Sequence, residues 1–228
     1  MTRPPHTLTG ARHRRVVSTA GPVDLWWYIA PHGRPVPGRV LLRHAVAARQ
    51  ARPVATVTVI RDPLGRPGLA PEQNLPPLRL TAAHSGPVTV AALLAAPRGT
   101  TRIGIGIEHL ASPPPPHLLR FALRPGEGAT ASGRPAPVRR EEFLMLWTAR
   151  EAIAETLGWS LLRALVDAEI TLRPRLCVAR LGHEMAPRGW QLIPLTLPGA
   201  PHTVTLAIHQ PPPRPRREHP WTSPAGRH

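Results

Sequence analysis

The chain has 228 residues, enough for one large domain or two small lobes with a hydrophobic core. Its 29 basic residues are all arginine and face only 13 acidic ones, so the net charge is +16. Such a surface suits polyanions: nucleic acid, a membrane, a phosphate-rich cofactor or an acidic partner protein. A single cysteine excludes an intrachain disulfide, and the longest apolar run (88–96) is too short to cross a bilayer, which takes about 20 residues. No secretory signal is visible, so we expect a cytoplasmic protein with no membrane partner.

Hydrophobic periodicity divides the chain into predicted strands, predicted helices and two tails. Residues 1–20 and 211–228 are rich in Arg and Pro, and we predict that both are disordered. The predicted strands are 23–30, 54–60, 88–95, 102–109, 175–182, 190–197 and 202–209, and the predicted helices are 38–51 and 140–158, the second capped by Gly158. Proline clusters at 113–116 and 135–137 bracket a loop or weak helix. Strand runs separated by a few helices indicate an α+β fold.

Three motifs follow one another along the chain. They are "LRLTAAHSGPVTVAAL" (78–93), a His-Ser-Gly turn between two strands; "RIGIGIEHL" (102–110); and "FLMLWTAREAIAETLGWSLL" (143–162). In this order they resemble the 4'-phosphopantetheinyl transferase superfamily, in the larger monomeric type that acts on peptide and polyketide synthetases. The turn keeps His-Ser-Gly, the strand keeps its final Glu, and the third motif aligns without a gap. The resemblance covers roughly residues 21–210.

The resemblance implies a fold and a reaction. The fold is a pseudo-twofold pair of similar α+β lobes, here 21–103 and 104–210, with coenzyme A in the cleft between them. The reaction is the Mg²⁺-dependent transfer of the phosphopantetheine arm of coenzyme A to a serine of an acyl or peptidyl carrier protein. The partners would be coenzyme A and an acidic carrier protein domain, and the protein would act as a monomer.

Two carboxylates would hold the metal if the resemblance is functional. Glu108 would be one Mg²⁺ ligand, and Glu151 would be a second ligand and the general base for the carrier serine. Each has a simpler interpretation: Glu108 as a surface acid on an edge strand, and Glu151 as a solvent-facing helical residue.

Five further residues would bind coenzyme A. His84 and Ser85 belong to the turn motif, and Arg150 takes the position of a family lysine. Arg66 takes another such position, and Arg43 is a candidate for the 3'-phosphate or the pyrophosphate. The alternatives are a turn histidine and serine with local hydrogen bonds, and ordinary surface arginines. Trp147 fits core packing better than a functional role.

Two positions depart from the family pattern. Gly106 stands where the family has a metal-binding Asp; glycine offers no ligand, and a water molecule could take the place of that ligand with weaker metal affinity. Glu155 stands at the position of a lysine, where its charge would repel a pyrophosphate unless it turned to the metal instead. These departures favour a second hypothesis: an inactive relative that binds coenzyme A or a carrier protein without transfer. A nucleic-acid binder is a third, but no reading helix, zinc ligands or stacking platform supports it.

Overall fold

The computed structural model describes residues 8–95, 100–111, 136–172, 174–185 and 187–211. It is a mixed α+β structure, as predicted, with several antiparallel sheets. The strands are β1 (Arg12–Val16), β2 (Val23–Ile29), β3 (Val59–Arg61), β4 (Pro67–Leu69), β5 (Leu78–Ser85), β6 (Val88–Ala95), β7 (Arg102–His109), β8 (Ala168–Thr171), β9 (Cys177–Leu181), β10 (Glu184–Met185), β11 (Trp190–Leu197) and β12 (Ala200–His209). The helices are α1 (Gly38–Arg49), α4 (Ala136–Leu157) and α5 (Leu161–Asp167), with 3-10 turns η1 (Val54–Thr56) and η2 (Pro71–Gln73).

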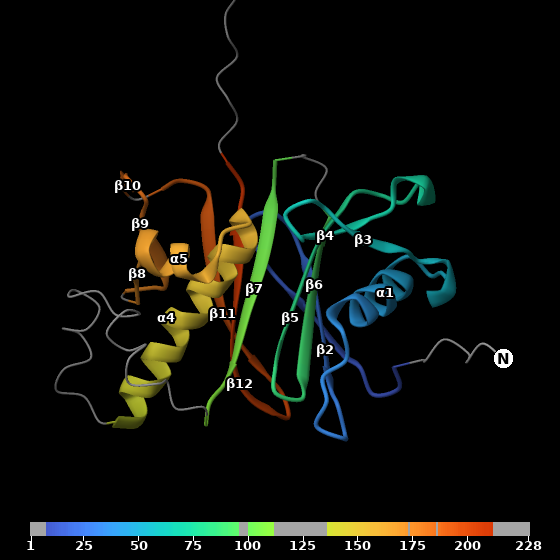
Figure 1. The fold of residues 1–228 in the computed structure, drawn as a ribbon, viewed down its shortest axis with the longest axis horizontal. Helices are drawn as coiled ribbons and strands as arrows, with labels where there is room; N and C mark the ends of the chain where they lie inside the picture. The colour runs from blue at the N-terminus through green and yellow to red at the C-terminus, as the bar shows by residue number, and fades with distance from the viewer. Residues whose placement is uncertain (1–7, 96–99, 112–135, 173, 186, 212–228) are drawn as a thin grey trace, which may run out of the picture.

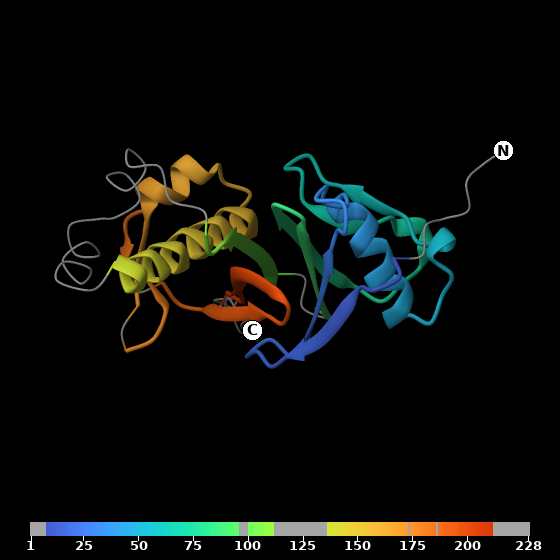
Figure 2. The same ribbon diagram turned by 90° about the horizontal axis from the view of Figure 1, so that it is seen from below.

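Two sheets face each other at the centre of the molecule. One has the strand order β1-β2-β6-β5 and the other β11-β12-β7. Helix α1 covers the outer face of the first sheet and α4 the outer face of the second, so the layers run helix, sheet, sheet, helix (Figures 1 and 2). Strands β5 and β7 are the facing edges of the two sheets and pack against each other.

The alternation of side chains on each strand supplies the two faces. On β7, Ile103, Ile105 and Ile107 join the core between the sheets, together with Leu25 of β2 and Leu206 of β12. Strand β6 is covered on both faces, by α1 and by the second sheet, which explains why nearly all of its residues are apolar.

Helix α4 ends where the sequence predicts. Gly158 has a φ of 70°, and the Trp159 N–H bonds back to the Ala154 carbonyl at 2.9 Å. This is the left-handed glycine cap that stops a helix. The helix begins at Ala136, earlier than the predicted 140, because a proline is tolerated in the first helical turn.

Three other sequence predictions need correction. Strand β1 (Arg12–Val16) lies within the predicted N-terminal tail, where it pairs with β2 despite its arginines. Residues 54–60 divide into η1 and β3. Pro53 precedes the tight turn η1, and the Val54 and Val57 carbonyls accept hydrogen bonds from the Arg43 side chain instead of pairing with a strand. The boundary at 103/104 cuts through β7, all of which belongs to the second sheet.

Other expectations concern residues that the structure does not describe. The rest of the first tail (1–7), most of the second tail (212–228) and the segment 112–135 between the proline clusters lie outside the described residues. Among the described helices, none is long and apolar enough to span a membrane.

Candidate functional site

Glu108 lies near the end of β7, at the edge of its sheet, where it meets the other sheet. The Ser85 hydroxyl, at the end of β5, donates a hydrogen bond to its Oε2 at 3.1 Å. The bond brings the His-Ser-Gly turn motif and the Glu of the second motif together, although they are 23 residues apart in the chain. The structure therefore joins two of the residues that the sequence singles out.

Glu151 reaches the same place from α4. Its Oε1 accepts a hydrogen bond from the Trp147 indole N–H at 2.9 Å, and its carboxyl group also bonds to the backbone N–H of Ile107. Burial, and then the nearby Glu108 carboxylate, raise the pKa of Glu151 to about 8, although the two hydrogen bonds act in the opposite direction. Two carboxylates thus share a confined space, which a cation would stabilise.

The donor set fits a hard divalent cation held by two carboxylates. Among the described residues, no three His, Cys, Asp or Glu side chains gather around one point that could hold a metal. Mg²⁺ is commonly held by one or two carboxylates together with waters and substrate phosphates. Glu108 and Glu151 match this minimal pattern.

Gly106 has a packing reason that the sequence does not reveal. A Cβ at this position would lie 2.1 Å from the Thr148 carbonyl oxygen and 2.8 Å from the Glu151 Cβ. A Cβ at Gly104 would lie 2.2 Å from the Ala152 carbonyl oxygen. The backbone of α4 therefore occupies the space beside β7, and no side chain larger than that of glycine fits at position 106 without a shift of the helix.

A cavity of about 230 Å³ lies near the Glu155 side of α4, one helical turn beyond Glu151. Its charged lining residues come from β5, β7, α4 and the β3–β4 turn: Asp62, Arg66, Arg79, Arg102 and Glu155. Arg66 is paired with Asp62, with Nη2 and Oδ2 2.7 Å apart. Burial raises the pKa of Glu155, while Arg61 and Arg66 oppose that rise. Two of the charged groups that act on Glu155, Arg66 and Asp62, line this cavity, and the Glu108 carboxylate is not among them.

Three of the predicted residues are not brought to these two places. His84 precedes Ser85 on β5 and, since neighbouring strand residues point to opposite faces, it lies on the face that carries α1. Arg43 donates from Nε to the Val57 carbonyl at 2.8 Å and so fixes the segment after α1. Arg150 is fully buried and donates from Nε to the Ala168 carbonyl at 3.2 Å, which directs it toward β8.

Sequence reasoning missed two residues beside the carboxylates. Trp147, expected only in the core, stacks on Phe143 with 5.9 Å between ring centroids and also donates to Glu151. The spacing of four residues on one helix is a signal for that contact. His202 on β12 is buried and lies with Nε2 3.1 Å from the Ser85 carbonyl oxygen; no sequence pattern marks it. Burial is the main cause that lowers the pKa of His202, so the neutral ring donates to that carbonyl.

The site is therefore a carboxylate pair with neutral donors around it, one helical turn from an arginine-containing cavity. This arrangement can hold a divalent cation and receive phosphate groups. Compared with known proteins, the chain matches no family model and no curated protein.

Proposed function

We propose that the protein is a cytoplasmic, monomeric 4'-phosphopantetheinyl transferase that acts on an acyl or peptidyl carrier protein. The two lobes would be β2, β5 and β6 covered by α1, and β7, β11 and β12 covered by α4. Coenzyme A would bind where β5 and β7 meet. The observation that carries the proposal is the Glu108–Glu151 pair, with Ser85 bound to one carboxylate.

The proposed chemistry is a phosphoryl transfer. The carrier serine Oγ forms a bond to the pantetheine-side phosphorus of coenzyme A, and the bond from that phosphorus to the bridging oxygen breaks. Adenosine 3',5'-bisphosphate leaves with the bonding electron pair, and the serine proton passes to a carboxylate. Glu151 is our candidate for that base, since it extends from α4 toward the β5–β7 junction.

The carboxylates and the arginines would have different roles in this reaction. Glu108 and Glu151 would hold Mg²⁺, which supplies charge neutralisation at the pyrophosphate when it is bound. Arg66 and Arg102 would bind phosphate groups of coenzyme A from the cavity. A cavity of 230 Å³ is smaller than a typical small-molecule pocket of roughly 300–1,000 Å³, so it would take only part of that substrate.

The direct test is the mass of the carrier. Purified protein, coenzyme A and Mg²⁺ would be incubated with a panel of apo carrier proteins, and each carrier would be weighed intact. We expect at least one carrier to gain one phosphopantetheine group and an equal amount of adenosine 3',5'-bisphosphate to appear. No gain on any carrier of a broad panel would contradict the proposed transfer.

A second candidate function has its own observation. Glu155 lines the cavity beside Arg66, where its carboxylate opposes a phosphate group. This favours an inactive relative that binds coenzyme A or a carrier protein without transfer. Calorimetry would show coenzyme A binding with no gain in carrier mass if this alternative holds.

A further inference from the structure

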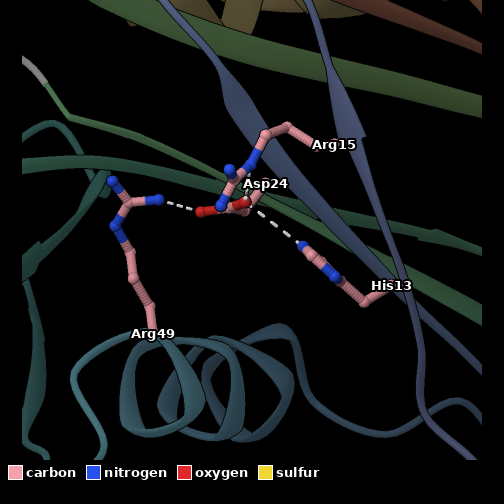
Figure 3. Close-up of polar contacts among 4 residues, drawn as sticks. All are labelled: His13, Arg15, Asp24 and Arg49. Carbon is pink, nitrogen blue, oxygen red and sulfur yellow. Dashed lines mark hydrogen bonds and ion pairs between the residues drawn. The ribbon is translucent and has the colours of Figure 1, made fainter.

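A second cluster of charged side chains lies on the other side of the first sheet, beside the C-terminal end of α1. Its centre is Asp24, the second residue of β2, whose side chain is only 5% exposed. The Arg15 Nε donates to Asp24 Oδ1 at 3.2 Å, and Arg49 Nη1 donates to Oδ2 (Figure 3). His13 Nε2 lies 3.2 Å from Oδ1. One buried carboxylate thus orients three basic side chains from two elements.

The charges of this cluster do not cancel. Burial, and then the charge of Arg15, lower the pKa of His13, so its ring is neutral at neutral pH. Two guanidinium groups therefore face one carboxylate, which leaves one positive charge. Each recorded bond to Asp24 uses one of the five N–H groups of an arginine, and the others remain for a ligand.

These side chains line a cavity of about 690 Å³, a volume typical of small-molecule sites. Its cationic wall is formed by Arg15 and Arg49. Its aromatic wall is formed by His13 and Trp26, which both line the cavity and whose ring centroids are 4.6 Å apart. Its lining shares only Leu78 with that of the cavity containing Arg66.

We propose that this cavity is a second binding site, for a small phosphate ester that carries a planar ring. The phosphate would bind to the outward N–H groups of Arg15 and Arg49, which Asp24 holds side by side. Guanidinium groups match phosphate oxygens in bidentate geometry. A pair of guanidinium groups is better matched by a phosphate ester, which has three terminal oxygens, than by a carboxylate, which has two. The ring would lie against the wall formed by His13 and Trp26.

The probe for this site is adenosine 5'-monophosphate, measured by calorimetry with the full chain. We expect saturable binding to wild type, weakened about tenfold or more by Arg15→Gln or Arg49→Gln, since each loses a charged hydrogen bond to phosphate. Arg39→Gln is the matched control, because Arg39 is an exposed residue on the same helix as Arg49. Arg66→Gln reports on the other cavity: binding weakened in Arg66→Gln and unchanged in folded Arg15→Gln would place the probe there and overturn the proposal.

Two additional probes separate the phosphate from the ring. Inorganic phosphate should bind more weakly than the nucleotide, and adenosine should bind more weakly still. The Arg15 side chain is 65% exposed, so Arg15→Gln is expected to fold and keeps the test decisive if Arg49→Gln does not. No binding by wild type, or equal binding by wild type and folded Arg15→Gln, would overturn the proposal. Carrier modification is not used in this test, and the comparison of Arg15→Gln with Arg66→Gln separates this cavity from the proposed coenzyme A site.

Discussion

At the scale of single residues, the hydrogen-bond donors to the carboxylate pair are neutral groups rather than arginines in the part of the chain that the structure describes. Ser85 donates to Glu108, while Trp147 and the Ile107 backbone N–H bond to Glu151. Neutral donors orient the carboxyl groups but add no positive charge, so burial and the nearby Glu108 still raise the pKa of Glu151 to about 8. In a chain with 29 arginines, this arrangement keeps the pair available for a cation.

Trp147→Phe tests the orientation of Glu151. The variant keeps a ring to stack on Phe143 but loses the N–H that donates to Glu151. Because a hydrogen bond to a charged group contributes roughly 1.5–3 kcal/mol, we expect carrier modification to slow about tenfold. Trp159→Phe is the control, since Trp159 contacts Arg163 instead. Equal rates for the Trp147→Phe variant and wild type would argue against a role for this bond.

Glu155→Gln tests the charge of the arginine-containing cavity. Removing the carboxylate removes repulsion toward a bound phosphate, so coenzyme A should bind about tenfold more tightly, as expected for charges separated by several ångströms in a medium of intermediate dielectric. Calorimetry measures the change, with Glu72→Gln as an exposed control. An unchanged affinity would show that coenzyme A phosphates do not lie near Glu155.

At the scale of secondary-structure elements, the site depends on how closely α4 approaches β7. Gly104 and Gly106 face the helix, and their missing side chains let backbone meet backbone. That contact places Glu151 of the helix beside Glu108 of the strand. The buried hydroxyls of Thr148 and Thr205, 2.8 Å apart, join α4 to the next strand of the sheet. Glycine at 106 thus sets the position of the carboxylates rather than supplying a ligand.

Gly106→Ala should therefore destabilise the protein. A methyl group 2.1 Å from the Thr148 carbonyl oxygen must displace the helix, and such overpacking typically costs about 1–3 kcal/mol. Gly68→Ala is the control, since nothing lies within 4 Å of a Cβ there. Urea unfolding should show a clear loss for the first variant and little change for the second. Equal stability of the two variants would mean that α4 and β7 are not packed this closely.

The local sequence pattern predicts β7 and the end of α4, but it does not predict β1 or the directions of the Arg43 and Arg150 side chains. The alternation of Ile and Gly predicts β7, and the Gly158 cap predicts the end of α4. Strand β1 is missed because its arginines resemble a solvated tail; only its pairing with β2 and the contacts to Asp24 explain why it is ordered. The directions of Arg43 and Arg150 depend on which carbonyls lie nearby in the fold, which sequence spacing does not specify.

At the scale of the whole molecule, the candidate site lies where the two sheets meet. The Ser85 hydroxyl bonds to Glu108 on β7, and the Ser85 carbonyl accepts from His202 on β12. Both bonds link an element of the first sheet to the second. A change in the packing of the two sheets would therefore separate Ser85 from Glu108, so the site and the layered fold depend on each other (Figure 2).

Magnesium should stabilise the folded protein as a whole. A ligand that binds only the native state at 100 times its Kd adds about 2.7 kcal/mol, which raises the Tm by several degrees. We expect this shift for wild type and not for Glu108→Gln or Glu151→Gln, since each leaves a single carboxylate. Differential scanning calorimetry with sodium chloride at matched ionic strength provides the control. Equal shifts for wild type and both variants would exclude these carboxylates as the ligands.

The central claim is that Glu151 takes part in the transfer of phosphopantetheine to a carrier protein. The most direct measurement is the intact mass of an apo carrier after incubation with coenzyme A, Mg²⁺ and either Glu151→Gln or Glu141→Gln, which alters an exposed glutamate on the same helix. We predict one added phosphopantetheine with wild type and with Glu141→Gln, and none with Glu151→Gln. Equal modification by all three proteins would contradict the role assigned to Glu151.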